Sequence, residues 1–321
     1  MNLQQAFKNR INIIKPYYTK KFAYKLKRLS NSKQLLVLFM PCFIYMLLFR
    51  YLPIWGVLIA FKDYKIFKGF MASEWIGFKN FISFFNNPMV YKLIMNTFLL
   101  SLYSMLWSFP MPILLALYLN ELKGARSKKF LQTVTYLPYF LSTVVVVGMF
   151  ILFLSPRGFV NIAIELLNKH PIVFFSNSNY FRIIYVVMGI WTGTGWGSII
   201  YIAALSNIDP TFYEAAKIDG ATKIQMVTFI TIPCILPTVV TMFLLNTGSL
   251  LSVGFERIFL MQNPANLSVS EVLSTYVYKQ GIKSANMGYA TAVDLFNSVV
   301  GLILIFMSNW VARSVSEYSL W

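Results

Sequence analysis

The segment that decides the fold is 207–237, which reads NIDPTFYEAAKIDGATKIQMVTFITIPCILP. Asp209 and Pro210 are typical of a helix start, because the carboxylate caps free N–H groups and proline has no N–H to leave unpaired in the first turn. Gly220 is typical of a helix end, since glycine takes the left-handed conformation at little cost. The sequence therefore predicts two short helices around a tight turn, followed by an apolar run that Pro233 opens.

The chain around this loop is apolar and poor in charge. It has 321 residues, of which 57% are hydrophobic and 12% are charged, whereas a soluble domain averages about 45–50% apolar and about 25% charged residues. So few charged side chains cannot cover a water-exposed surface. The composition therefore excludes a soluble enzyme, a coiled coil and a disordered protein, and it indicates a polytopic membrane protein.

Six stretches are long and apolar enough to cross a membrane, because about 20 residues rising about 1.5 Å each cover a hydrocarbon core of about 30 Å. They are continuously apolar rather than alternating, so the fold predicted is all-α, with six transmembrane helices rather than a barrel. We expect a membrane domain over 34–321, with a loop at 207–232 between its fourth and fifth spans. The predicted spans are 35–55, 93–119, 131–154, 183–205, 234–254 and 289–311.

Basic residues outnumber acidic ones, with 28 Lys and Arg against 11 Asp and Glu, for a formal net charge of +17. Nine of the basic residues and no acid lie in 1–33. Basic residues mark the cytoplasmic side of a membrane protein, so we expect 1–33 to be a basic cytoplasmic tail and both termini to be cytoplasmic. The anionic inner leaflet accounts for such a tail, and we expect no nucleic-acid partner.

Residues that build metal or catalytic sites are scarce. The chain has one histidine, His170, and two cysteines, Cys42 and Cys234, which lie inside apolar runs. It has no CxxC pair and no glycine-rich phosphate loop of the GxxxxGK[ST] type. We therefore expect no metal site, no bound cofactor and no catalytic site in this chain.

The central loop resembles the EAA loop of the permeases of binding-protein-dependent ABC importers. Other stretches are similar to carbohydrate importers of the maltose permease type. The residues that carry the first resemblance are Glu214-Ala215-Ala216, Asp219-Gly220-Ala221, Phe229, Ile232-Pro233 and Pro237. Those that carry the second are Asn96-Thr97, Leu137-Pro138-Tyr139 and Ser319-Leu320-Trp321.

The resemblance implies a type I ABC importer permease fold in the cytoplasmic membrane, with the loop acting as a cytoplasmic coupling helix that docks on an ATPase subunit. It also implies an oligosaccharide substrate and several partners: a second homologous permease, two ATPase subunits that bind ATP and Mg, and an extracellular solute-binding protein. Glu214 is then the expected ion-pair partner of a basic residue on the ATPase, and Gly220 sets the turn. The expected coupling residues are Glu214, Ala215, Ala216, Asp219, Gly220 and Ala221.

Polar side chains inside the spans either line a water-filled path or bond neighbouring helices. Tyr139 and Thr143 are expected one turn apart on one face of the third span, and the resemblance places both, with Thr192 and Asn246, near a sugar site. Asp294, deep in the sixth span, is expected to pair with a partner subunit, to line the path or to sit near the outer interface. The candidate path residues are Tyr139, Thr143, Trp191, Thr192, Asn246, Ser249 and Asp294.

Other functions stay open at this point. An ABC permease for a non-sugar solute would share the loop, a secondary transporter would need an internal repeat of spans, and a membrane enzyme would need paired acids or a nucleophile with its base. The expected outer segments are rich in Lys and Arg, Arg257 among them. This charge suits an anionic glycan such as a uronic-acid oligosaccharide, but it is equally ordinary for the solvated loops of a basic protein.

Overall fold

The computed structural model describes residues 33–248 and 253–315. Nearly all of the predicted tail 1–33 and the candidate path residue Ser249 lie outside these ranges. The chain divides into two units, Met1–Leu58 and Ile59–Trp321. Within the described ranges five helices are long and apolar enough to cross a membrane, or six if one bent pair counts as a single span. The predicted helical membrane architecture is confirmed.

The described part of the first unit is one apolar helix. It begins as α2, Lys33–Met46, and passes through the π turn η1, Leu47–Tyr51, into the 3₁₀ helix η2, Leu52–Phe61, whose last residues belong to the second unit. Its side chains from 36 to 55 are exposed. The helix continues through Pro53, because the π turn before it widens the backbone where the proline ring would clash with the preceding turn.

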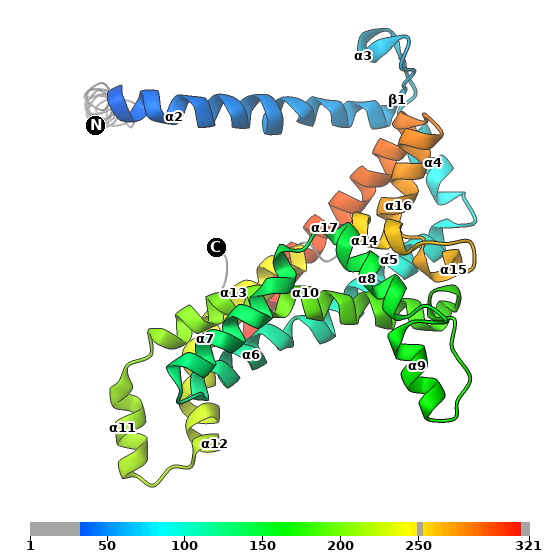
Figure 1. The fold of residues 1–321 in the computed structure, drawn as a ribbon. Helices are drawn as coiled ribbons and strands as arrows, with labels where there is room; N and C mark the ends of the chain where they lie inside the picture. Colours follow the sequence, from blue (N-terminus) through cyan, green and yellow to red (C-terminus); the bar gives the residue numbers. More distant parts are fainter. Residues whose placement is uncertain (1–32, 249–252, 316–321) are drawn as a thin grey trace, which may run out of the picture. The chain divides into compact units, whose positions relative to one another are not determined.

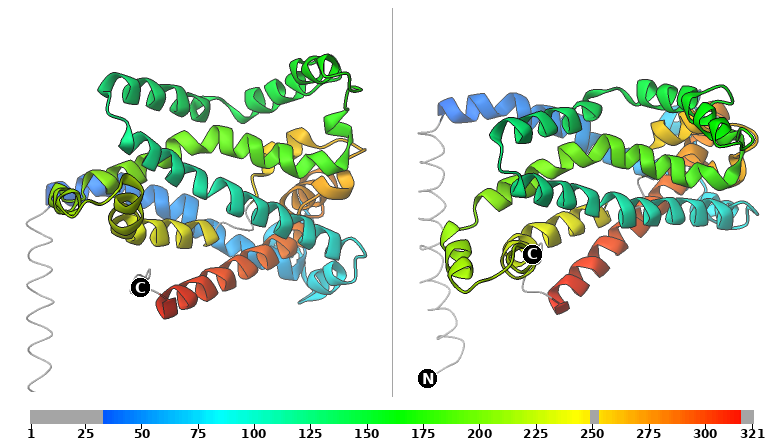
Figure 2. Two further views of the ribbon diagram at one scale, coloured as in Figure 1. Left: turned by 90° about the horizontal axis from the view of Figure 1, so that it is seen from below. Right: turned by 60° about the horizontal axis from the view of Figure 1, so that its bottom comes forward.

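The second unit is arranged around α10, Ser178–Ser206, which packs against α5, Val90–Ser108, and α6, Pro110–Glu121 (Figures 1 and 2). α5 and α6 form one continuous helix. On another side of α10 lies α13, Ile232–Gly248, which also packs on α17, Met287–Val315. These helices cover the predicted second, fourth, fifth and sixth spans, except that the fifth begins earlier than expected and the described part of its helix reaches 248.

Shorter elements connect the long helices. β1 and β2 pair antiparallel, with Lys62 opposite Trp75. Most of these elements gather at the end of the unit that lies away from α11 and α12 (Figure 1). They are β1 Lys62–Asp63, α3 Gly69–Ala72, β2 Glu74–Trp75, α4 Lys79–Phe85, α9 Phe159–Leu166, η4 Phe174–Ser176, α14 Phe255–Met261, α15 Leu267–Ser270, α16 Leu273–Tyr278 and η6 Lys279–Lys283.

The third predicted span, 131–154, is not one helix. It contains the second half of α7, Ala125–Tyr136, then the 3₁₀ turn η3, Leu137–Phe140, and finally α8, Thr143–Phe153. The helix is bent by 101° at the break between η3 and α8. The expectation of one continuous span is therefore wrong.

The cause of the break is local. Leu141 and Ser142 are extended, with ψ of 140° and 148°, and the Ser142 Oγ accepts a hydrogen bond from Val145 N at 3.3 Å. Ser142 thus caps α8 as a new helix. As a result Tyr139 and Thr143 belong to different helices, and the expectation that they lie one turn apart on one face is also wrong.

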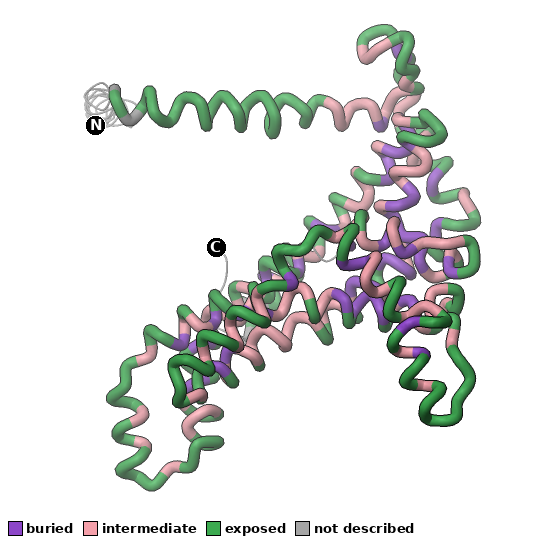
Figure 3. Tube along the Cα trace, in the orientation of Figure 1, coloured by how far each residue is buried: buried purple, intermediate pink, exposed green. Residues whose placement is uncertain are grey.

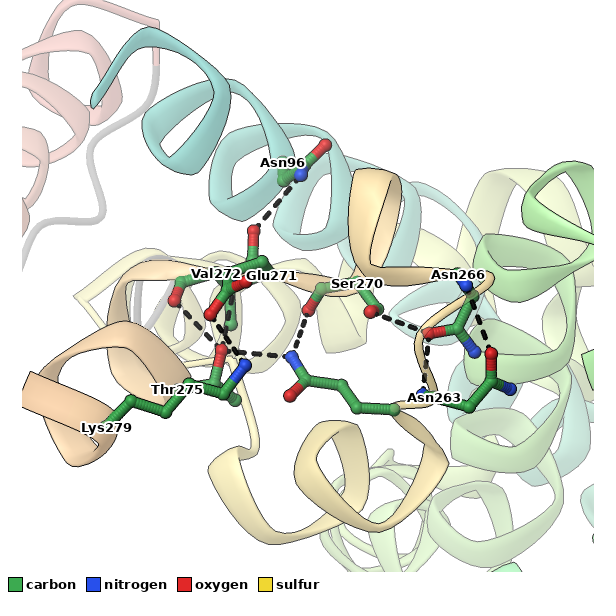
Figure 4. A network of polar contacts seen from close by, with 9 residues as sticks. Asn96, Asn263, Asn266, Ser270, Glu271, Val272, Thr275 and Lys279 are labelled. Atoms are coloured by element: carbon green, nitrogen blue, oxygen red, sulfur yellow. Dashed lines mark hydrogen bonds and ion pairs between the residues drawn. The ribbon is translucent and has the colours of Figure 1, made fainter. Parts of the chain in front are cut away.

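Buried side chains concentrate where α5, α8, α10 and α14–α16 meet (Figure 3). Hydrogen bonds fix α15 and α16 against α5 there (Figure 4). The Asn96 Nδ2 donates to the carbonyls of Ser268 and Glu271, both at 3.1 Å, and the Thr97 Oγ1 accepts from Leu273 N at 3.0 Å. The buried pair Asn96-Thr97 therefore holds the segment that follows α14 against the long helices.

We expect Gly195 of α10 to tolerate no side chain. A Cβ added there would collide with the main chain at Thr135 of α7, whereas a Cβ at Gly193 meets nothing within 4 Å. Gly195→Ala should lower the free energy of unfolding by about 1–3 kcal/mol, the usual cost of overpacking. Gly193→Ala should not lower it, since alanine is the better helix former. Thermal unfolding of the two purified variants in detergent tests this, and equal destabilisation of both would contradict close packing of α10 on α7.

Candidate functional site

The loop 207–232 begins with α11, Pro210–Ile218, and projects from the ends of the long helices (Figure 1). The Asp209 side chain caps the helix, because its Oδ1 accepts a hydrogen bond from Thr211 N at 2.9 Å. This bond lowers the pKa of the Asp209 carboxyl below its ordinary value, because it stabilises the ionised form. The helix start is the one that the sequence predicts.

The turn after α11 is closed by two hydrogen bonds. Gly220 has φ of 74°, its N–H donates to the Lys217 carbonyl at 3.1 Å, and the Ala221 N–H donates to the Ala216 carbonyl at 2.9 Å. This is the Schellman arrangement, which needs a left-handed residue at the position of Gly220. The turn therefore has one defined shape rather than a range of loop conformations.

The second helix of the loop is α12, Lys223–Met226, which starts with a capping box formed by Thr222 and Gln225. It continues through the π turn η5, Val227–Thr231, into α13, so that 223–248 is one uninterrupted helix. The expected opening of a new span at Pro233 is therefore not observed. As before Pro53, a π turn ahead of the proline widens the backbone and lets the helix continue.

A side-chain contact joins the two helices of the loop. The hydroxyl groups of Tyr213 in α11 and Thr231 in η5 are 3.0 Å apart and share a hydrogen bond. Thr231 is buried and Tyr213 is partly buried. This contact ties α11 to the helix that continues into α13.

The outer surface of the loop carries large apolar side chains. Phe212, Ile218 and Ile224 are 55%, 87% and 80% exposed. They lie outside the helices long enough to cross a membrane or at the start of one, so they suit contact with a protein partner. Sequence reasoning missed these three, because apolar residues do not stand out in an apolar chain. Glu214 and Asp219 are exposed too, and neither forms an ion pair with a residue in the described ranges.

A cavity of about 260 Å³ lies between the broken third span, α10 and α14. Three predicted path residues line it: Tyr139 and Thr143, from either side of the break, and Thr192 from α10. Tyr139 is stacked on Trp196, with ring centroids 4.6 Å apart and planes at 5°. The break thus assembles residues that the sequence had assigned to one helix face.

Arg257 of α14 is the charged residue of this cavity. Its Nη2 donates to the Thr192 Oγ1 at 3.4 Å, and its guanidinium carbon lies 5.4 Å from the centre of the Tyr185 ring. Arg257 forms no ion pair with any acid in the described part of the chain. The sequence counted Arg257 only among the outer basic residues, since nothing in the pattern around it indicates that it lies beside Thr192.

A second cavity of about 380 Å³ contains Asn246, together with several serines and the hydroxyl-bearing residues Tyr185 and Tyr201. Gly189 and Gly193 line both cavities. The cavities are therefore neighbours along α10. Asn246 does not line the cavity that holds Arg257.

The remaining candidate path residues lie elsewhere. Trp191 lines neither cavity and packs near Phe150, with ring centroids 5.9 Å apart. Asp294 is exposed on α17 and lines a different cavity of about 430 Å³, which it shares with Ser274 and Tyr278. The structure therefore brings together Tyr139, Thr143 and Thr192, and among the described candidates it leaves Trp191, Asn246 and Asp294 outside that cavity.

Residues 108–317 match the family described as binding-protein-dependent transport system inner membrane component. The chain is 44% identical over 293 residues to Protein LplB of Bacillus subtilis (strain 168), which covers 91% of this chain and 92% of that protein. It is 42% identical over 291 residues to the polygalacturonan/rhamnogalacturonan transport system permease protein YteP of the same organism, covering 90% and 91%.

A solved structure is also similar. It is a bacterial alginate ABC transporter in complex with an alginate pentasaccharide-bound periplasmic protein, and one of its chains matches with a TM-score of 0.84 and 38% identity, over 92% of this chain and 99% of that chain. The resemblance carried by the EAA loop is thereby confirmed, as is the type I permease fold. The chain belongs to the family of binding-protein-dependent transport system inner membrane components, and it is a multi-pass permease subunit of an ABC importer.

Proposed function

We propose that this permease carries oligosaccharides, including acidic, uronate-containing ones, across the cytoplasmic membrane. The names of YteP and of the alginate transporter support an acidic glycan substrate, because galacturonan and alginate are chains of uronic acids. The alternatives of a non-sugar solute and of a secondary transporter have no comparable support. Import is driven by ATP hydrolysis on separate subunits, and this chain contributes the path and the mechanical coupling.

The observation that carries the proposal is the construction of the loop 207–232. Its turn is fixed by Gly220, its apolar outer surface is exposed, and its second helix runs without interruption from 223 to 248. Such a loop fits a groove on an ATPase subunit and passes movement of that subunit to α13. Ala215, Ala216 and Ala221 keep the docking edge thin, and Glu214 and Asp219 are available to basic residues of the partner.

The proposal includes the remaining members of the transporter. A second homologous permease completes the pathway, two ATPase subunits bind ATP and Mg, and an extracellular solute-binding protein delivers the substrate. This chain itself holds no catalytic site, metal or cofactor in the proposed arrangement. Its tail 1–33 and both termini are cytoplasmic, on the same side as the loop, and the domain from 34 to 321 lies in the bilayer.

Gly220→Val tests the coupling role, because the left-handed conformation is strained for any residue with a Cβ and a β-branched residue suffers most. We expect the variant to reach the membrane with its partner permease but to lose most of the ATPase subunit on purification. Gly69→Val is the matched control, since Gly69 has φ of 68° and a Cβ added at either glycine meets nothing within 4 Å. Equal retention of the ATPase by the two variants would refute the coupling role.

The complete importer in proteoliposomes tests the transport function. We expect the solute-binding protein loaded with a short oligogalacturonate or oligoalginate to raise ATP hydrolysis several-fold above the rate with the unloaded binding protein. Binding-protein-dependent uptake of labelled oligosaccharide should accompany it. If only a loaded amino acid or ion stimulates hydrolysis, the assignment to oligosaccharides is wrong.

A further inference from the structure

We propose that Arg257 is the residue with which this permease recognises the carboxylate groups of its substrate, at a subsite shared with Thr192, Thr143 and Tyr139. This inference rests on the proposed transport of acidic oligosaccharides and deepens it. It assigns the recognition of charge to a residue of this chain, within the membrane, in addition to whatever selection the binding protein makes.

The position of Arg257 in the fold is the first reason. Its guanidinium bonds Thr192, which lies at the middle of α10, Ser178–Ser206, a helix long enough to span the membrane. A cation at this depth is costly unless it faces a water-filled path or a counter-ion. The described residues supply no ionised partner, because the two ion pairs found there join Lys65 to Asp63 and Lys279 to Glu271.

The surroundings of Arg257 leave room for an anion. Its other contact is the face of Tyr185, which leaves donors of the planar guanidinium group unused. Gly189 lies beside it, and a Cβ added at Gly189 would be 3.0 Å from the Arg257 Nη1. The absence of a side chain at Gly189 and Gly193 therefore keeps the cavity open where the cation lies.

The neighbouring groups match a sugar acid. A guanidinium binds a carboxylate through two parallel hydrogen bonds, and the hydroxyls of Thr192 and Thr143 are suited to sugar hydroxyl groups. Tyr139 is 47% exposed and is held by its stacking on Trp196, so it offers a fixed aromatic surface to the C–H groups of a sugar ring. One cation, two hydroxyls and one aromatic ring in a single cavity are the chemistry of a uronate subsite.

Arg182, near the start of α10, is arranged differently from Arg257. Arg182 donates through Nη2 to the Asn96 Oδ1 at 3.2 Å, and Asn96 in turn bonds the carbonyl of Glu271. It is thereby joined to the hydrogen bonds that hold α16 in place, and it does not line the cavity of Arg257. Arg182 thus bonds a residue of the packed network, whereas Arg257 bonds a hydroxyl that lines the cavity.

Arg257→Gln tests the inference by removing the charge while keeping a hydrogen-bond donor. Equilibrium binding to the purified, nucleotide-free complex is measured with a short oligogalacturonate, and with its methyl ester, which has the same linkages and no carboxylate charge. We expect Arg257→Gln to weaken binding of the acid by about tenfold to a hundredfold, as for the loss of a charged hydrogen-bonded pair. Binding of the ester should be unchanged.

Lys283→Gln is the matched control. The Lys283 Nζ lies 5.4 Å from the centre of the Phe259 ring of α14, so this variant removes a cation next to the same helix without reaching the cavity. It should bind the acid as the wild type does. Arg257→Lys keeps the charge but lacks the paired donors of the guanidinium. We expect it to weaken binding of the acid by about threefold to tenfold and to leave binding of the ester unchanged.

Two results would overturn the inference: binding of the acid unchanged in Arg257→Gln, or equal loss of the acid and the ester. The second result would give Arg257 a structural role. If Arg257→Gln does not assemble, Arg257→Lys decides alone, and the absence of a selective loss in it overturns the inference. The proposed function is tested separately. It is wrong if no oligosaccharide-loaded binding protein stimulates ATP hydrolysis by the wild-type importer.

Discussion

The break between η3 and α8 is the feature on which the membrane domain depends. Main-chain N–H and C=O groups are costly in hydrocarbon, so a helix is interrupted at membrane depth only where protein or water covers the interruption. Ser142 caps the helix that follows the break, and on the other side Gly195 lets α10 approach the main chain of Thr135. The same interruption brings Tyr139 and Thr143 from two helices into one cavity.

The loop 207–232 is continuous with two of the helices that line the cavities, α10 and α13. α10, which carries Gly193 in the walls of both, ends at Ser206 directly before the loop, and the helix 223–248 leaves the loop and carries Asn246. The π turn ahead of Pro233 removes the hinge that a proline would otherwise place there. In the proposed coupling, movement of the loop would therefore reach the cavity walls through the main chain, on both sides of the turn.

The sequence predicted what local rules determine. Apolar length predicts spanning helices, and Asp209 and Gly220 predict the ends of α11, because each acts on hydrogen bonds within a few residues. The break in the third span was missed, since its apolar run hides one serine that becomes a helix cap. The role of Asn96 could not be predicted from the sequence either, because its partner Glu271 is 175 residues away in the chain.

Arg257 shows the limit of counting charge along a chain. Most of the formal +17 lies in segments that are expected to set topology, and a residue between spans is counted with them unless its depth is known. Depth is also what makes Arg257 suitable for transport. Its hydroxyl partner Thr192 belongs to α10, whereas Arg257 belongs to α14, so a shift of α10 relative to α14 separates the group that would hold the carboxylate from one that would bind the sugar hydroxyls. Since α10 leads directly into the loop, the movement that couples to ATP hydrolysis is also suited to weaken the subsite and release the substrate.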